Sequence, residues 1–120
     1  MAKASRFTNG IVLRDGRPNA AENPTGETQI KQIMVYTPTI NPASVASATS
    51  AEQTFTVTGL QAGDIVVAVN KPTATTGVGI VGARVSAADT LALTFMNSTA
   101  GAVDPASEVY TVVVMRATAN

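Results

Sequence analysis

Few residues of this chain have the chemistry of a catalytic or metal-binding site. The sequence contains neither histidine nor cysteine, which removes a frequent general base, a common zinc ligand and every thiolate. Its acids Asp64, Asp89, Asp104 and Glu108 fall singly beside expected turns or strand ends, without calcium-loop spacing. Aspartate is favoured at such positions because it hydrogen-bonds the local backbone. We expect structural acids rather than a catalytic pair or a calcium site.

The serine and threonine hydroxyls offer no better nucleophile. None can have a histidine partner, and no local motif supports a serine–lysine pair that uses Lys71. We therefore expect no catalytic residues, no metal site and no enzyme activity.

One glycine pattern has the spacing of a dinucleotide-binding loop. Residues 77–82 read G-x-G-x-x-G, but that fingerprint requires a strand before it and a helix after it. Here residues 83–85 continue a strand pattern. We predict a strand interrupted at Gly79 and Gly82 by bulges or close backbone approach, and we expect no cofactor.

The elements that must position these residues are all strands. Apolar residues never keep helical spacing, and short β-branched runs alternate with turn residues. The fold class we expect is an all-β antiparallel β-sandwich, of jelly-roll or Greek-key type, with six or seven strands and an extended N-terminal arm. Strand order stays open. The expected strands cover residues 30–36, 54–58, 65–69, 78–85, 90–97 and 109–116, with brief pairing at 44–47.

Two of these strands alternate clearly between apolar and polar residues. Alternation over residues 54–58 and 90–97 places every second side chain on a buried face. The residues expected in the core are Phe55, Val57, Leu91, Leu93 and Phe95. The threonines between them, such as Thr54, Thr56, Thr58, Thr90 and Thr94, are expected to face outward.

Charge is concentrated near the start of the chain. Half of the charged residues lie within the first 32, which predicts an arm at 1–28 and a weakly charged domain at 29–120. The five basic and three acidic residues among the first 32 leave a balance of only +2. Nucleic-acid binding needs many more phosphate contacts, so we expect no nucleic-acid partner.

The arm contains one apolar run, Ile11–Leu13, between turn residues. It is either a chance patch in a disordered leader or a short strand that pairs with a neighbouring sheet edge. We favour the strand, because three consecutive aliphatic residues in a polar segment favour burial. The residues expected at a protein interface are therefore Lys3, Arg6, Phe7, Ile11, Val12, Leu13, Arg14 and Arg17.

The domain has few charged residues, so its surface is also expected to be weakly charged. Charged residues make up 13% of the chain, about half of the usual share of about 25%. The outward threonine faces are either ordinary solvent-facing positions or a flat surface for packing against other proteins. We favour an interface. No window reaches the roughly 18 apolar residues of a membrane span, and no secretory signal is visible, so we expect no membrane partner.

Characteristic strand and turn phrases lie at residues 41–46, 54–60, 63–64, 69–72, 83–91 and 104–108. These phrases resemble small structural proteins of tailed bacteriophages. The resemblance covers about residues 41–116 and leaves out the arm. It implies a virion structural protein, of the kind that decorates and cements phage heads. Decoration families share no catalytic residues to carry over.

This resemblance sets the functional expectation. Such a protein is made in the host cytoplasm, forms a homo-oligomer such as a dimer or trimer, and binds the major capsid protein on the exterior of the virion. The arm is expected to latch onto a neighbouring subunit. The alternative is a tail, baseplate or fibre component that serves as an adaptor or host-binding module.

Overall fold

The computed structural model describes residues 29–118, and every regular element among them is a β-strand. Ladders within this part of the chain pair their strands antiparallel, which confirms the expected all-β, antiparallel class. The strands are β1 (Gln29–Tyr36), β2 (Thr39–Ile40), β3 (Thr49–Thr56), β4 (Ile65–Asn70), β5 (Val78–Ala87), β6 (Thr90–Asn97), β7 (Glu108–Val109) and β8 (Thr111–Thr118).

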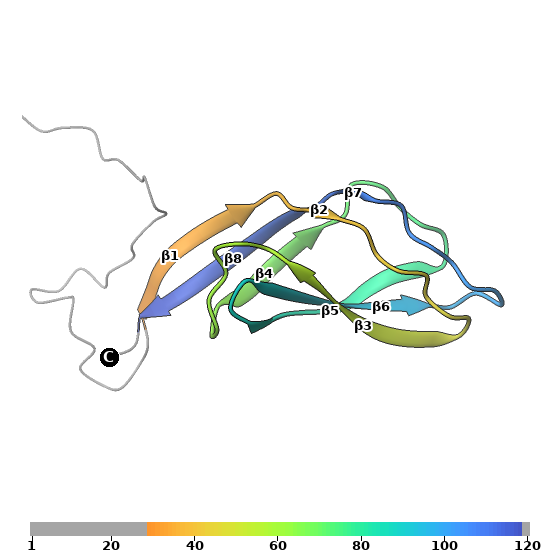
Figure 1. Cartoon of the computed structure of the whole chain (residues 1–120), viewed down its shortest axis with the longest axis horizontal. Helices are drawn as coiled ribbons and strands as arrows, with labels where there is room; N and C mark the ends of the chain where they lie inside the picture. The colour runs from red at the N-terminus through yellow and green to blue at the C-terminus, as the bar shows by residue number, and fades with distance from the viewer. Residues whose placement is uncertain (1–28, 119–120) are drawn as a thin grey trace, which may run out of the picture.

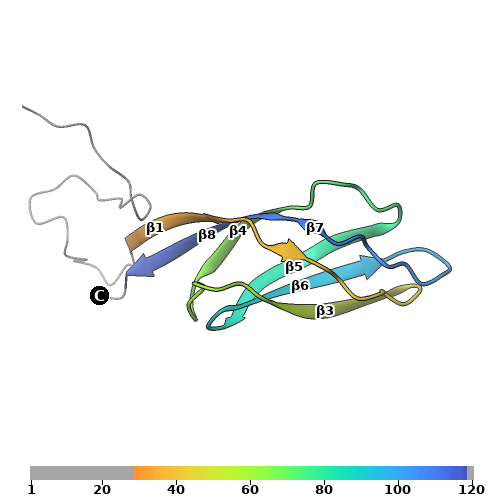
Figure 2. The same cartoon turned by 45° about the horizontal axis from the view of Figure 1, so that its top comes forward.

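The strands form two three-stranded sheets and one two-stranded ladder (Figure 1). The β8 sheet has the order β1-β8-β4, the β6 sheet has the order β3-β6-β5, and β2 pairs with β7. In both views the β8 sheet lies toward the end where β1 begins, and the β6 sheet lies toward the other end (Figures 1 and 2). Strand β4 is an edge of the first sheet, and β5 is an edge of the second.

One hydrophobic cluster takes side chains from both sheets. Strand β6 contributes Leu91, Leu93 and Phe95, each fully buried, and β8 contributes Val112 and Val114. The connecting segments complete the cluster with Ile40, Val45, Val57, Leu60 and Tyr110. The expected burial of the three β6 residues and of Val57 is confirmed, whereas Phe55 is half-buried against the cluster.

The predicted number of strands was wrong, because the described residues contain eight rather than six or seven. The two-residue strand β2 was missed, and the expected strand at 109–116 is divided into β7 and β8. The division falls at Tyr110, whose backbone N–H donates to Pro38 O at 2.9 Å instead of continuing a ladder. Strand β3 also begins five residues before the predicted start at residue 54.

The threonine faces are only partly as expected. Thr54 and Thr56 on β3 are exposed, but Thr90 and Thr94 on β6 are half-buried. Strand β6 is the central strand of its sheet, so its outward residues have a neighbouring strand on each side, β3 and β5.

Most turns place glycine or aspartate at left-handed backbone positions, and Ala48, with a φ of 52°, is the exception among the described residues. Gly59 and Gly63 have φ values of 105° and 92°, as the pattern of the connection between β3 and β4 predicts, and Asp89 has a φ of 58° in the β5–β6 turn. Gly77 is the most constrained glycine, because it has a φ of 78° and an added Cβ would lie 2.2 Å from Thr99 Cγ2.

Candidate protein-binding groove

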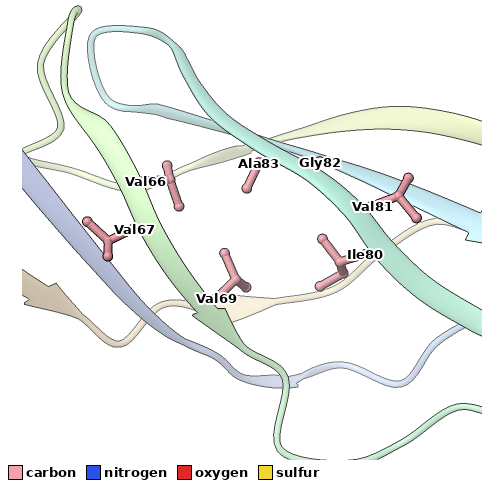
Figure 3. A pocket seen from close by; sticks show the side chains of 7 residues that line it. All are labelled: Val66, Val67, Val69, Ile80, Val81, Gly82 and Ala83. Atoms are coloured by element: carbon pink, nitrogen blue, oxygen red, sulfur yellow. The ribbon is translucent and has the colours of Figure 1, made fainter.

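An apolar groove separates the facing edges of the two sheets. It has a volume of about 310 Å³ and is lined by Val66, Val67, Val69, Ile80, Val81, Gly82 and Ala83. Figure 3 shows Val66, Val69, Ile80 and Ala83 between the ribbons of β4 and β5, with Val67 and Val81 on their outer sides. The side chains that line it are aliphatic, and backbone polar atoms are exposed beside them. The groove can therefore contact both apolar side chains and backbone groups of a partner, and it offers no side chain for acid–base chemistry.

Both walls of the groove carry a β-bulge. The β4–β8 register shifts between Val66 and Ala68, and the β5–β6 register shifts between Ile80 and Gly82. The extra residue is a valine in each case, and Val67 and Val81 are 52% and 60% exposed. Bulges redirect side chains and interrupt edge pairing. Here they place two exposed valines on the rims of the groove.

The floor of the groove belongs to the core. Val66, Val69 and Ile80 are half-buried and pack against the buried cluster. No backbone hydrogen bond joins β4 to β5 in the described part of the chain. The groove is therefore a place where core-like surface reaches solvent between two open strand edges.

Ion pairs hold both ends of β4. At its start, Asp64 accepts from Arg116 Nε and Nη2 of β8, each at 2.8 Å, and also from the Gln61 N–H at 2.9 Å. After its end, Lys71 Nζ lies 2.9 Å from Glu108 Oε2, and Thr73 Oγ1 donates to the same carboxylate. Edge strand β4 is thus fixed to β8 and β7 without a partner on its outer side.

The pKa values of these carboxyls follow from their partners. Hydrogen bonds from the Arg116 guanidinium lower the pKa of Asp64 below its ordinary value, against the opposing effect of burial. The Lys71 ammonium lowers the pKa of Glu108 in the same way. Both acids are ionised and paired at neutral pH, as structural acids are.

The remaining acids do not converge on a site. Asp89 Oδ1 accepts from the Gly59 N–H at 2.8 Å, and Glu52 accepts from Arg84 Nε and Nη2 on the exposed face of the β6 sheet. Within residues 29–118, no three acids lie together as possible metal ligands. The G-x-G-x-x-G residues 77–82 lie at the start of β5, which continues as a strand to Ala87.

The interface residues predicted from the sequence all lie outside the described residues. These are Lys3, Arg6, Phe7, Ile11, Val12, Leu13, Arg14 and Arg17. Sequence reasoning did not identify the valines of the groove. The sequence feature that could have pointed to the β4 valines is the run of five apolar residues at 65–69. A strand with one face in water should instead alternate between apolar and polar residues. Such a run fits burial on both faces equally well, so strand order is needed to interpret it.

Comparisons with known proteins identify no relative. No family model matches the chain, and neither a curated protein nor a solved structure is similar to it. In the stretch from Gln29 to Thr118, no helix is long and apolar enough to cross a membrane.

Proposed function

We propose that this chain is a capsid decoration protein of a phage, which binds the outer surface of the major capsid protein lattice and stabilises the head without catalysis. The groove between β4 and β5 is the observation that supports a protein-binding role. Its rim valines are more than half exposed, and exposed apolar surface of this kind marks protein-interaction sites. The phage assignment rests on the sequence resemblance.

We also propose that the domain is a β-sandwich of Greek-key or jelly-roll type. Support comes from the core, because side chains of the β8 and β6 sheets pack into one cluster. Two sheets that share an inner face are the architecture of a sandwich. In this arrangement the groove is an open side of the sandwich, between one edge of each sheet.

The proposed mechanism is mechanical. A homo-oligomer can contact two neighbouring capsid subunits at once. A capsid subunit can then leave the lattice only if its contact with the decoration protein breaks as well as its contact with the lattice. Attachment through several copies also raises the effective affinity. The groove supplies one contact on each copy, and the arm residues named above supply a second. A weakly charged surface is compatible with this role because interface cores are poor in charge.

Binding to undecorated capsids tests this function. We expect the double variant Val67→Ser/Val81→Ser to lower the number of copies bound per capsid at least tenfold, because it makes both rims of the groove polar. Copies per capsid are counted by quantitative mass spectrometry after the capsids are separated from free protein.

The matched control is Val35→Ser. Val35 is 63% exposed on β1, the edge of the β8 sheet opposite to β4, so its replacement should leave occupancy unchanged. Failure of the unmodified chain to bind capsids would contradict the decoration function. Equal occupancy for the double variant and the control would contradict the role of the groove.

A further inference from the structure

The outer face of the β8 sheet has the composition of a protein core. Residues of β8 that alternate with buried Val112 and Val114 point away from the core. The registers of β1 and β4 place one residue of each strand beside them, so that two rows cross the sheet. Both rows consist of aliphatic residues and one methionine. They are Val35–Val113–Ala68 and Ile33–Met115–Ile65.

The same face continues past the end of the β8 sheet. Strands β2 and β7 pair in the register that joins residues 32–36 of β1 to β8, so they extend this ladder. Val109 of β7 therefore lies on the outer side and is 52% exposed, while Ile65 and Val35 are 54% and 63% exposed. Half of the large apolar residues that are exposed in the described chain lie on this one face.

The outer face of the β6 sheet is built differently. Glu52 of β3 and Arg84 of β5 form an exposed ion pair across β6, with 2.8 Å between Arg84 Nε and Glu52 Oε2. A face with such a pair is suited to water. A sheet that is apolar on both faces is instead typical of a layer covered on both sides. The described chain covers the β8 sheet on its inner side, where the core lies.

We infer that a second copy of this chain covers the outer face, so that two β8 sheets pack face to face in a symmetric dimer. The dimer rests on the proposed function, whose mechanism uses a homo-oligomer, and gives that oligomer a contact surface. None of the residues in the two rows is charged. Such a face fits a partner that is also uncharged, because a charge buried against it would lose water without gaining a counter-charge.

A second copy meets this requirement through its own β8 sheet. A two-fold axis sets the same patch of both copies against each other, and two stacked sheets commonly pack with their strands about 30° apart. Val113 and Met115 belong to the central strand and lie near the middle of the contact, where interface residues contribute most. Val35 lies on edge strand β1. Val35→Ser keeps the face uncharged at its periphery, so this variant should still dimerise.

The size of the face determines how strongly the copies associate. Three strands about 4.8 Å apart and seven residues with a rise of about 3.3 Å give roughly 300 Å² on each copy. A stable complex buries about 800 Å² on each partner. Dilute copies are therefore expected to be monomers that dimerise as their concentration rises. Binding to one particle holds copies close together, which raises their effective concentration.

Sedimentation equilibrium of the full chain, from about 0.01 to about 1 mM, tests the dimer. The average mass should rise from that of a monomer toward that of a dimer. Ile65→Lys should raise the dissociation constant of the dimer about tenfold or more, because it places an ammonium group from each copy in an apolar contact. The matched control is Met96→Lys, since Met96 is 48% exposed on the β6 sheet. The control should dimerise like the unmodified chain.

Two outcomes of this experiment would overturn the inference. One is an unmodified chain that stays monomeric at about 1 mM, and the other is an equal effect of the two lysine substitutions. Nuclear magnetic resonance of the unmodified chain adds a readout without any substitution. Resonances of Ile65 and Val113 should shift as the concentration rises, whereas those of Thr54 and Met96 should stay constant. Shifts confined to the β6 sheet would also contradict the inference.

The proposed function and the dimer can fail separately. A chain that occupies capsids but never dimerises would contradict the dimer alone. A chain that dimerises through this face but leaves capsids bare would contradict the decoration function alone, since sedimentation is measured without capsids.

Discussion

Strands β4 and β6 are both rich in apolar residues, yet the fold treats them differently. β6 buries five of its eight side chains, whereas none of the six in β4 is fully buried. β6 lies between β3 and β5, while β4 has only β8 beside it. Position in a sheet, rather than composition, decides which apolar strand becomes core and which remains available to a partner.

Truncating one side chain of β6 and one of β4 should give the largest difference in the free energy of unfolding. Phe95→Ala is expected to lower the free energy of unfolding by about 4 kcal/mol, because Phe95 is fully buried and its loss leaves a cavity. Val67→Ala should cost about 0.5 kcal/mol or less, since Val67 is half exposed. Urea denaturation of both variants measures the difference. Similar losses would contradict the distinction between core and groove.

The ion pair at the start of β4 should give the next largest effect. Asp64→Asn is expected to lower the free energy of unfolding by about 2 kcal/mol at pH 7, because it leaves the half-buried Arg116 guanidinium without the buried carboxylate that pairs with it. The exposed pair of Glu52 and Arg84 is the control, and Glu52→Gln should have a much smaller effect. A loss no larger than that of the control would show that Asp64 does not anchor β4.

The same pair predicts a dependence on pH. The pKa of Asp64 is lower in the folded chain than its ordinary value of 3.8, so its stabilising effect is fully present above that pH. The effect is lost as the pH falls through the folded pKa. The stability difference between wild type and Asp64→Asn should therefore shrink below about pH 4, measured by urea denaturation across acidic pH. A difference that stays constant would contradict this assignment.

Replacing Tyr110 should change the free energy of unfolding less than Asp64→Asn does, and in the opposite direction. Its side chain is fully buried, and its hydroxyl has no hydrogen-bond partner within the described structure. Removal of an unsatisfied buried hydroxyl relieves a desolvation cost, so Tyr110→Phe should leave stability unchanged or raise it by about 1 kcal/mol. Thermal denaturation measures this. A clear loss of stability would indicate a partner for the hydroxyl.

Alkaline titration provides a check on Tyr110 itself. Burial raises the pKa of Tyr110 from 10.0 to about 12, so its phenol should stay protonated in the folded chain until about that pH. Because the unfolded chain ionises earlier, this residue lowers stability as the pH rises from 10 to 12. Ultraviolet absorbance should lose the late phenolate transition in Tyr110→Phe.

The smallest effect on stability is expected in the groove. Val67→Ser/Val81→Ser should change the free energy of unfolding by about 0.5 kcal/mol or less, because both side chains are largely exposed at bulges. Urea denaturation with Val35→Ser as the reference measures it. A large loss would mean that these valines act as core residues rather than as a binding surface.

Local features of the fold could be predicted from the sequence. Alternation indicated that Leu91, Leu93 and Phe95 are buried. The irregularity expected at Gly82 is confirmed by a register shift beside it, but the one expected at Gly79 was wrong, because Gly79 pairs in register with Met96. These features depend on neighbouring residues alone. The division of the last strand at Tyr110 was not predictable, because it depends on a hydrogen bond to the distant Pro38.

The groove depends on strand order, and that is why the sequence alone could not identify it. β8 comes last in the chain and pairs with β1 and β4, whose residues lie far earlier. No local pattern in residues 65–69 shows that the second neighbour of this strand is missing. The sequence therefore predicted an apolar strand and left its exposure undetermined.

The most direct test of the account is a cryo-electron microscopy map of the decorated particle. The account predicts copies of the domain on the outer capsid surface, with density of a neighbouring subunit in contact with the β4/β5 groove of each copy. A map in which the chain lies elsewhere in the virion, or in which every β4/β5 groove is filled with solvent, would contradict it.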